Sequence, residues 1–481
     1  MLKGLEVSVL NSNVYLKDNF DYRLDAEYFS KENLDLLKKI ERNEYAVIGD
    51  FAYVTDGIHT SIDYCENSNV NLFSATTPRE NYFDLSRQVF ISEHAHALNP
   101  RTALQNNDII ISTVGTIGNC AVVDESVLPA NSDRHVGIVR LLNQDFLPRY
   151  VSTFLLTKFG KFQTWRESTG NVQLNLFLYR IRTLKIAKLS NDFQCEIERL
   201  VVGANQNIEN SKSIYTQAET LLLETLGMAD FTPSSEAVNI KSFKDSFVAS
   251  GRLDAEYYQP KYEEVVAHIK AQAYQHLIDL VDIQKSVEPG SDVYCEDGEA
   301  GLPFLRVADY SKQGLTPPQK QLKSSYVSEN WDKLNALKPR KNTILFSKDG
   351  SVGEAYCLTE DLEAVTSGAV LHLSVKNTDV LLPEYLTLAL NSKLVKMQSE
   401  RDAGGSIILH WRVSEIENVV VPLVDMTIQR QIAALVQQSF ALKAHSTHLL
   451  DVAKRAVEIA IEQDEAAAMA FIECEVNDDN E

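Results

Sequence analysis

Two glycine-bearing segments are the first candidates for chemistry in this sequence: TVGTIG at residues 113–118 and KDGSVG at residues 348–353. A glycine-rich loop that holds phosphate reads GxxxxGK[ST], because its backbone N–H groups surround the phosphate and its lysine binds the charge. Neither segment has the trailing lysine, and no GxGxxG cofactor loop follows a strand. Both segments lie between short β-like runs, so the pattern predicts tight turns.

Other patterns of catalytic residues are also missing from the sequence. Residues 99–101 read NPR, which is not the Asn-Pro-Pro-aromatic motif of an amino-methyltransferase. His94 and His96 have no metal-binding companions, and the six cysteines show no CxxC or Cys/His ligand spacing. The sequence therefore supports neither a nuclease nor a motor site, and we expect no metal and no cofactor.

Length and composition are those of an ordinary globular protein. The 481 residues suggest roughly two to four domains. Neither an apolar run near the ~20 residues that span a bilayer nor a signal peptide is recognisable, so we expect a cytoplasmic protein with no membrane contact. A net charge of −21 argues against binding nucleic acid over the whole surface. Residues 302–348 nevertheless hold nine Lys and Arg against three Asp and Glu, which suits a protein whose partner helps to hold the ligand.

The strongest signal is an internal repeat. RLDAEYF at residues 23–29 returns as RLDAEYY at residues 252–258. NNDIIISTVGTIGNCAVV from Asn106 answers KNTILFSKDGSVGEAYCL from Lys341, and QCEIERLV from Gln194 answers QRQIAALV from Gln429, both at an offset of 235. This period far exceeds the 20–50 residues of a solenoid or propeller, so we expect two similar modules.

Each module is expected to contain the same elements in the same order. A short helix follows RLDAEY, with Ser30 as its N-cap in the first module and Pro260 at its first position in the second. A region of short β-like runs comes next, and a long helix with a heptad pattern ends the module. The long helices could each pack on their own module, but these modules are too small to cover them, so we expect the helices to pack on each other.

RLDAEY itself marks the entry into each module. Asp25 and Glu27 are two residues apart and would not share a helix face, so we do not interpret them as a catalytic carboxylate pair. We expect a buried junction with Arg–Asp pairing.

In these features the chain resembles the specificity (S) subunits of type I restriction–modification systems. The resemblance covers nearly the whole chain and occurs twice. It rests on the two RLDAEY stretches, on LPFLRVADYSKQGL from Leu302, on NDIIISTVGTIGNCAVV and NTILFSKDGSVGEAYCL, and on VVVPLVDMTIQRQIAALV from Val419.

The resemblance implies an α+β fold with two tandem, similar target-recognition domains, separated by long helices that form an antiparallel coiled-coil-like spacer. The expected segments are an N-terminal segment with a short helix (1–44), target-recognition domain 1 (45–190), spacer helix 1 (191–227), a linker with a short helix (228–274), target-recognition domain 2 (275–425), spacer helix 2 (426–470) and an acidic tail (471–481). The tail lies outside what the resemblance explains, and docking of a partner and a solvated tail are both open.

The resemblance also implies the function. Each domain would read half of a split site in double-stranded DNA, and the helices would fix the gap and dock two methyltransferase (M) subunits. The subunit itself would not be an enzyme, so methyl transfer and any cleavage would come from partners, either a motor-nuclease (R) subunit or other defence effectors. A helix of about 30 residues is about 45 Å long, or roughly 13 base pairs of duplex. Because the modules differ in detail, we expect an asymmetric site with half-sites about one helical turn or slightly more apart.

Base reading needs Arg, Lys, amide and hydroxyl side chains on loops that reach the groove edges. Our candidates in the first half are Arg79, Arg87, Thr113, Thr116, Arg134, Arg166, Asn171, Gln173 and Asn175. In the second half they are Arg306, Tyr310, Lys312, Lys320, Lys348, Ser351, Arg401, Ser406, His410 and Arg412. STGNVQLN at residues 168–175 either presents its amides to DNA or caps the sheet with local hydrogen bonds. The alternative function is a protein adaptor or decoy that uses the same fold without reading DNA.

Overall fold

The computed structural model describes residues 19, 21–26, 28–86, 88–170, 173–296, 299–405 and 408–478. The chain forms two compact units, of which unit 1 comprises residues 1–208 and 444–481 and unit 2 comprises residues 209–443. Two long helices, α8 and α16, run from one unit into the other, so each unit contains part of both. The boundaries between the two units lie inside the long helices and not at the ends of the seven expected segments. The seven segments therefore stay a prediction.

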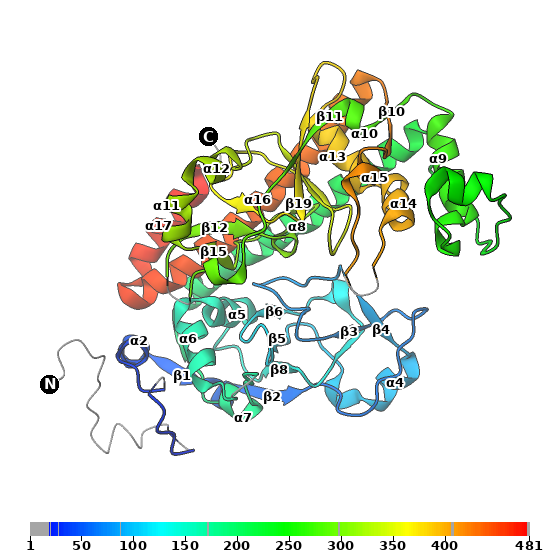
Figure 1. Ribbon diagram of the computed structural model, residues 1–481. Helices are drawn as coiled ribbons and strands as arrows, with labels where there is room; N and C mark the ends of the chain where they lie inside the picture. The colour runs from blue at the N-terminus through cyan, green and yellow to red at the C-terminus, as the bar shows by residue number, and fades with distance from the viewer. Residues whose placement is uncertain are drawn as a thin grey trace. The chain divides into compact units, whose positions relative to one another are not determined.

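Unit 1 alternates short helices and strands before its first long helix (Figure 1, blue to cyan). Its helices are α2 (Lys31–Glu41), α3 (Ile48–Phe51), α4 (Glu93–Leu98), α5 (Pro148–Leu156), α6 (Lys158–Glu167), α7 (Leu178–Ile181), α8 (Asn191–Thr225, shared with unit 2) and α17 (Glu465–Asp478). Its strands are β1 (Tyr45–Val47), β2 (Ala52–Asp56), β3 (Val70–Phe73), β4 (Val89–Ile91), β5 (Ile109–Ser112), β6 (Cys120–Val122), β7 (Ala130–Ser132), β8 (Val136–Leu141) and β9 (Lys185–Ala187).

Unit 2 repeats this order (Figure 1, green to orange). Its helices are α9 (Pro260–Lys270), α10 (Leu277–Leu280), α11 (Ser324–Glu329), α12 (Trp331–Ala336), α13 (Pro383–Asn391), α14 (Lys393–Asp402), α15 (Val413–Ile416) and α16 (Met426–Glu462, shared with unit 1). Its strands are β10 (Tyr274–His276), β11 (Val281–Lys285), β12 (Leu302–Leu305), β13 (Tyr310–Ser311), β14 (Gly314–Leu315), β15 (Lys320–Leu322), β16 (Ile344–Ser347), β17 (Ala355–Cys357), β18 (Val365–Thr366), β19 (Val370–Val375) and β20 (Val420–Pro422).

The sheets of the two units have the same topology. Unit 1 has a four-stranded antiparallel sheet in the order β2-β8-β5-β6, a three-stranded sheet in the order β4-β3-β7 and the pair β1-β9. Unit 2 has the matching sheets β11-β19-β16-β17, β15-β12-β18 and β10-β20, together with the small hairpin β13-β14. In both three-stranded sheets the last pair of strands is parallel. The predicted α+β fold with two similar domains is therefore confirmed.

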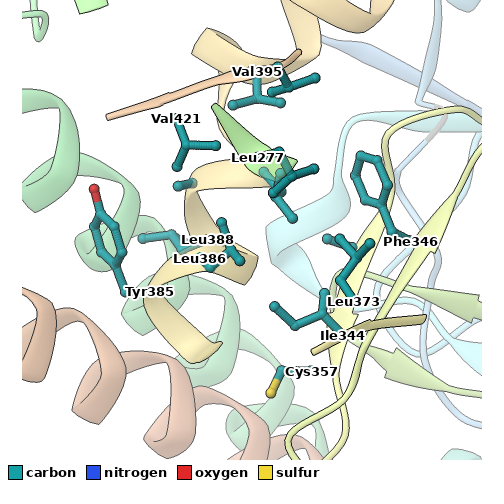
Figure 2. Close-up of a cluster of buried hydrophobic side chains, with 14 of the residues drawn as sticks. Leu277, Ile344, Phe346, Cys357, Leu373, Tyr385, Leu386, Leu388, Val395 and Val421 are labelled. Carbon is teal, nitrogen blue, oxygen red and sulfur yellow. The ribbon is translucent and has the colours of Figure 1, made fainter. Parts of the chain in front are cut away.

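The core of each unit lies between its four-stranded sheet and the helices that follow. In unit 2, Ile344 and Phe346 of β16 and Leu373 of β19 face Leu386 and Leu388 of α13, and Figure 2 shows these side chains converging. All five are buried. The β-like runs of the sequence therefore form the buried strands. Alternate side chains of these strands face an apolar layer, which α5 covers in unit 1 and α13 covers in unit 2.

The long helices pack on each other within each unit, as predicted. In unit 2, the Ser211 hydroxyl of α8 donates to the Ser439 carbonyl of α16 at 2.8 Å, and the Ser439 hydroxyl donates to the Ser211 carbonyl at 2.8 Å. In unit 1, Gly203 lies against Leu449, and the Ser190 N–H at the start of α8 donates to Glu465 at 2.8 Å, just beyond the end of α16. The helices of unit 1 are therefore antiparallel.

The start of each module has the expected caps. The Ser30 hydroxyl accepts a hydrogen bond from the Asn33 N–H at 3.2 Å, and Pro260 is the first residue of α9. Both RLDAEY stretches form the expected Arg–Asp pair, with Arg23 and Asp25 2.7 Å apart and Arg252 and Asp254 2.6 Å apart.

The second long helix ends earlier than predicted. The expected helix 426–470 is divided into α16, which ends at Glu462, and α17, which starts at Glu465 and includes most of the expected acidic tail. Asp464 caps α17 by accepting a hydrogen bond from the Ala467 N–H at 2.8 Å, and Ile472 is buried in the core of unit 1. This apolar contact keeps the segment folded despite its acidic sequence. Across the described residues, no helix is long and apolar enough to cross a membrane.

Candidate nucleic-acid interface

In unit 1 the two ends of the STGNVQLN stretch pair with each other beside the first glycine turn. The Thr169 and Asn175 backbones exchange hydrogen bonds of 3.0 and 2.8 Å, and the Leu176 N–H donates to the Thr113 carbonyl at 2.9 Å. We call residues 168–176 the recognition hairpin of unit 1 and residues 112–119 its glycine turn. Residues 171 and 172 lie outside the described part of the chain.

Unit 2 builds the same arrangement from different residues. The Gly404 and His410 backbones exchange hydrogen bonds of 3.0 and 2.7 Å, and the Trp411 N–H donates to the Lys348 carbonyl at 2.8 Å. We call residues 403–411 the recognition hairpin of unit 2, and its ends lie against the glycine turn of that unit (residues 347–354). Residues 406 and 407 lie outside the described part of the chain. The two stretches that the sequence singled out in each module are neighbours in space.

The glycine turns are turns rather than phosphate loops. Gly115 and Gly350 have φ of +73° and +75°, and a Cβ at either position would meet no atom within 4 Å. Positive φ favours glycine there, and the open space around both residues shows that each turn protrudes from its sheet. The predicted tight turns are confirmed.

Two further loops join the glycine turn of unit 1. The Ser112 hydroxyl donates to the Ala75 carbonyl at 2.5 Å and the Thr116 hydroxyl donates to it at 3.1 Å, which brings in the loop after β3. The Thr113 N–H donates to the His135 carbonyl at 3.1 Å, which brings in the loop between β7 and β8. In unit 2 the Lys348 N–H donates in the same way to the Ala369 carbonyl at 2.9 Å. Several loops therefore meet at one end of each four-stranded sheet.

The candidate residues divide into three groups by exposure. The exposed candidates are Thr116, Arg134, Gln173, Lys320, Ser351, His410 and Arg412. The partly buried candidates are Arg79, Asn175, Arg306, Lys312, Lys348 and Arg401, together with Arg166, whose side chain is only 8% exposed. Thr113 and Tyr310 are buried, and Arg87, Asn171 and Ser406 lie outside the described residues.

Four candidates have structural contacts that leave little for a ligand. Arg166 donates to the Tyr28 carbonyl at 2.9 Å and pairs with Glu167 at 2.8 Å, and Arg401 pairs with Asp402 at 2.7 Å. Thr113 is buried because its backbone joins the glycine turn to its neighbours. Tyr310 is buried under Glu354, whose carbonyl accepts from the Tyr310 hydroxyl at 3.3 Å. These four do not present exposed donors or acceptors to a groove.

Most of the candidate cations already have carboxylate partners. The pairs are Arg79 with Asp84, Lys312 with Glu219, Lys348 with Asp349, Arg306 with Asp309, and Arg412 with Glu415. Burial would raise the pKa of Asp84, but hydrogen bonds from Ser86 and Arg79 together hold this pKa below its ordinary value. Within the described residues, Arg134 and Lys320 have no carboxylate partner. Local ion pairs therefore neutralise much of the positive charge that the sequence suggested.

Several exposed apolar side chains beside the hairpins were not among the predicted site residues. Ile408 and Leu409 in the hairpin of unit 2 are 55% and 41% exposed. Directly after the hairpin of unit 1, the rings of Phe177 and Tyr179 stack at 6.0 Å and are about half exposed. Ile408 and Leu409 are visible in the sequence as apolar residues at a loop, whereas Tyr179 lies in α7, with Phe177 directly before this helix.

The exposed groups of the site suit the binding of a polar ligand. Among the residues that the structure describes, no group of three or more His, Cys, Asp or Glu is gathered closely enough to hold a metal ion. Burial raises the pKa of Cys357 to about 12 and that of Cys120 further, so neither is a thiolate nucleophile at neutral pH. The loops instead present hydroxyl, amide, imidazole and guanidinium groups, which bind base edges and phosphates.

Comparison with known proteins agrees with this description. Residues 274–452 match the family model of the type I restriction modification DNA specificity domain. The S subunit of a type I restriction–modification system from M. genitalium is 13% identical with a TM-score of 0.39, covering 87% of this chain and 95% of that one. The HsdS subunit from Thermoanaerobacter tengcongensis is 16% identical with a TM-score of 0.27, covering 88% and 97%. A comparison with curated proteins finds no match.

Residues 274–452 therefore resemble a type I restriction modification DNA specificity domain. This family match supports there the resemblance to specificity subunits. The matched residues include β10 to β20, the second glycine turn and the second recognition hairpin. Unit 1 has the same sheets and the same hairpin contacts.

Proposed function

We propose that the protein is a DNA specificity subunit that binds a split, asymmetric site in double-stranded DNA. Each unit would read one half-site through its recognition hairpin, its glycine turn and the loops around them. The observation that carries the proposal is a repeated backbone with different exposed residues. Gln173 and Asn175 in unit 1 match Ile408 and His410 in unit 2, so two identical half-sites would meet different side chains.

The charge of the chain supports binding in a complex rather than alone. The net charge is −21, and carboxylates already pair most of the candidate cations. DNA binding gains its salt-dependent affinity from cations that neutralise phosphates, and few cations here are available for that. We propose that two methyltransferase (M) subunits dock on this chain and supply positive surface.

The proposal leaves the covalent chemistry to the partners. Methyl transfer would belong to the M subunits. Any cleavage would belong to a motor-nuclease (R) subunit, or another effector of a methylation-based phage-defence complex would act instead. The specificity subunit itself would not be an enzyme and would work in the cytoplasm, where the host DNA lies. Neighbouring genes separate the two kinds of system, because a motor-nuclease gene beside this one favours restriction.

Methylation mapping tests the proposal directly. Long-read sequencing would compare a host that carries this gene and its adjacent methyltransferase with the same host after deletion of this gene. We expect a two-part asymmetric methylated motif only when the gene is present. An unchanged methylome would overturn the proposal and favour a protein adaptor or decoy that uses the fold without reading DNA.

A half exchange sharpens that test. Residues 45–190 would be replaced by the matching region of a relative with a different motif, and residues 275–425 would stay. We expect one half-site to change and the other to remain. Loss of both half-sites at once, from a complex that still assembles, would contradict independent reading by the two units.

A further inference from the structure

The RLDAEY stretches hold the base of each recognition hairpin. In unit 1, the Arg23 guanidinium donates to the Arg166 carbonyl at 2.7 Å and to the Ser168 carbonyl at 3.3 Å. Arg166 lies in the last turn of α6, and Ser168 is the residue where the recognition hairpin starts. In unit 2, the Arg252 guanidinium donates to the Asp402 carbonyl at 2.8 Å, at the last residue of α14.

Both arginines donate to a carbonyl group at the C-terminal end of a helix. The last carbonyls of a helix have no partner within the helix and carry the negative end of the helix dipole. A guanidinium that donates to them satisfies an acceptor and is attracted by the dipole. The same contact fixes the direction in which the chain leaves the helix, because the carbonyl that it holds lies at the end of the helix, just before the hairpin starts.

The guanidinium itself is held on its other edge. Arg23 forms two hydrogen bonds with Asp25, of 2.7 and 2.9 Å, and Arg252 forms two with Asp254, of 2.9 and 2.6 Å. A bidentate pair fixes orientation as well as position. Only 17% of the Arg23 side chain and 18% of the Arg252 side chain are exposed.

An aromatic ring completes each arrangement. The guanidinium carbon of Arg23 lies 4.6 Å from the centroid of the Tyr28 ring, and that of Arg166 lies 3.5 Å from the same ring. In unit 2 the ring is Tyr257, with Arg252 at 4.5 Å and Arg401 at 5.2 Å. We call Arg23, Asp25 and Tyr28 the clamp of unit 1, and Arg252, Asp254 and Tyr257 the clamp of unit 2.

We propose that Arg23 and Arg252 are positioning residues for DNA recognition, each of which sets the placement of the recognition hairpin in its own unit. This inference rests on the proposed function. The proposal explains why the RLDAEY stretch occurs twice almost unchanged while the two recognition hairpins differ in sequence. The arginine bonds to backbone carbonyls, so the contact does not depend on the side chains of the hairpin. Neither arginine touches DNA in this proposal. Each acts through the hairpin.

The test replaces each arginine in the full complex and maps methylation. Arg23→Gln and Arg252→Gln keep a polar side chain of similar length but lose the bidentate pair and the cation. We expect Arg252→Gln to relax one half-site, with methylation of sites mismatched there raised about tenfold, the discrimination that a base contact supplies. Arg23→Gln should relax the other half-site by a similar factor.

Each variant carries its own control, because the half-site read by the other unit should stay intact. Arg199→Gln in unit 1 and Arg340→Gln in unit 2 are matched exposed arginines with carboxylate partners away from the hairpins, and neither should change the motif. Arg252→Lys keeps a cation at the helix end and should restore part of the discrimination. This recovery distinguishes positioning from loss of folding.

The outcomes separate the inference from the proposed function. If the unaltered protein directs no split motif, the proposed function fails whatever the variants do. If it directs one and the two Gln variants leave both half-sites intact, relax the same half-site or relax both equally, the clamps do not position the hairpins. A fall in total methylation with an unchanged motif would likewise assign the arginines to stability alone.

Discussion

Buried glutamines make identical contacts in the two units, whereas exposed residues at matching positions differ. Gln163 pairs through both ends of its amide with the Lys185 backbone at 2.9 and 2.8 Å, and Gln398 pairs in the same way with the Val420 backbone at 2.9 Å for both bonds. At the surface, Phe177 of unit 1 corresponds to Arg412 of unit 2. The buried amides bond to backbone atoms and make the same contacts in both units, while the exposed residues differ.

The two units differ at one buried position. Arg180 is fully buried in unit 1 and pairs with Glu167 at 2.7 Å, whereas the matching residue of unit 2 is the partly exposed Glu415. Unit 1 therefore has a fully buried cation in an ion pair where unit 2 has a partly exposed carboxylate. This difference predicts that the units respond unequally to loss of charge.

The largest difference between the units is expected from Arg180→Met. Glu167 would keep Arg166 but lose its second cation in a buried site, which costs up to about 3 kcal/mol. Hydrogen exchange of unit 1 peptides should rise accordingly. Glu415→Gln is the matched change in unit 2 and should cost less, because Glu415 pairs most closely with the exposed Arg412 and lies 3.8 Å from Arg252. Equal effects in the two units would contradict the comparison.

An equal effect in the two units is expected from Gln163→Leu and Gln398→Leu. Each change leaves one buried N–H and one buried carbonyl without a partner, at about 1–3 kcal/mol for each group. Hydrogen exchange of peptides around β9 and β20 measures the two costs separately. A difference of more than about 1 kcal/mol between them would show that the amide contacts are alike in geometry only.

Acid should weaken unit 2 more than unit 1. Burial lowers the pKa of His372 to about 4, and this side chain is 3% exposed, with its Nε2 2.8 Å from the Thr366 hydroxyl. The sheet register gives Ile138 at the matching place in unit 1. The folded-state pKa lies below the ordinary value of about 6.5, so stability is present above pH 6.5 and falls as the pH drops towards 4.

At pH 5 the expected loss from His372 is about 2 kcal/mol relative to pH 7.5. Hydrogen exchange of unit 2 at the two pH values, corrected for the intrinsic exchange rate, measures it. His372→Ile introduces the residue of unit 1 and should remove this part of the pH dependence. If the variant loses as much stability in acid as the unaltered protein, another group is responsible.

The smallest effect is expected where the long helices cross. Ser446 matches Ser211 in the repeat, but its hydroxyl, buried in the described structure, has no hydrogen-bond partner, because Ala204 stands where the repeat of unit 2 has Ser439. Ala204→Ser should supply a partner and stabilise the helix pair of unit 1 by about 0.5–1 kcal/mol.

Ser439→Ala is the reciprocal change and should cost about 1 kcal/mol in unit 2. The midpoint of thermal unfolding of the purified chain, together with hydrogen exchange in α8, reports both. A destabilised Ala204→Ser variant would mean that the crossing in unit 1 is too tight for a hydroxyl and differs from that in unit 2.

Part of the candidate site followed from the sequence. The glycine turns and the amide-bearing stretch were found because each has a local signature of turn residues, and the structure brings them together as backbone neighbours. The exposure of Gln173, Ser351 and Arg412 also agrees with the expected surface. The roles of these residues in reading DNA stay a proposal.

Other features of the site depend on residues distant in the chain. Arg166 was a candidate for DNA contact, yet its guanidinium lies over the ring of Tyr28, which is far from it in sequence. The carboxylate that pairs with Lys312 is Glu219 of α8, and the one that pairs with Arg79 is Asp84, across a loop. Composition alone counts these charges but does not pair them.

By itself the sequence determined the duplication, the order of elements and the long helices, because periodicity, caps and turn residues act within a few residues of one another. Only the tertiary structure decided that α17 folds onto unit 1, that RLDAEY holds a helix end, and which cations remain without a carboxylate. Those outcomes depend on burial and on contacts between distant residues, where desolvation and pairing decide whether a charge is a surface group or part of the core.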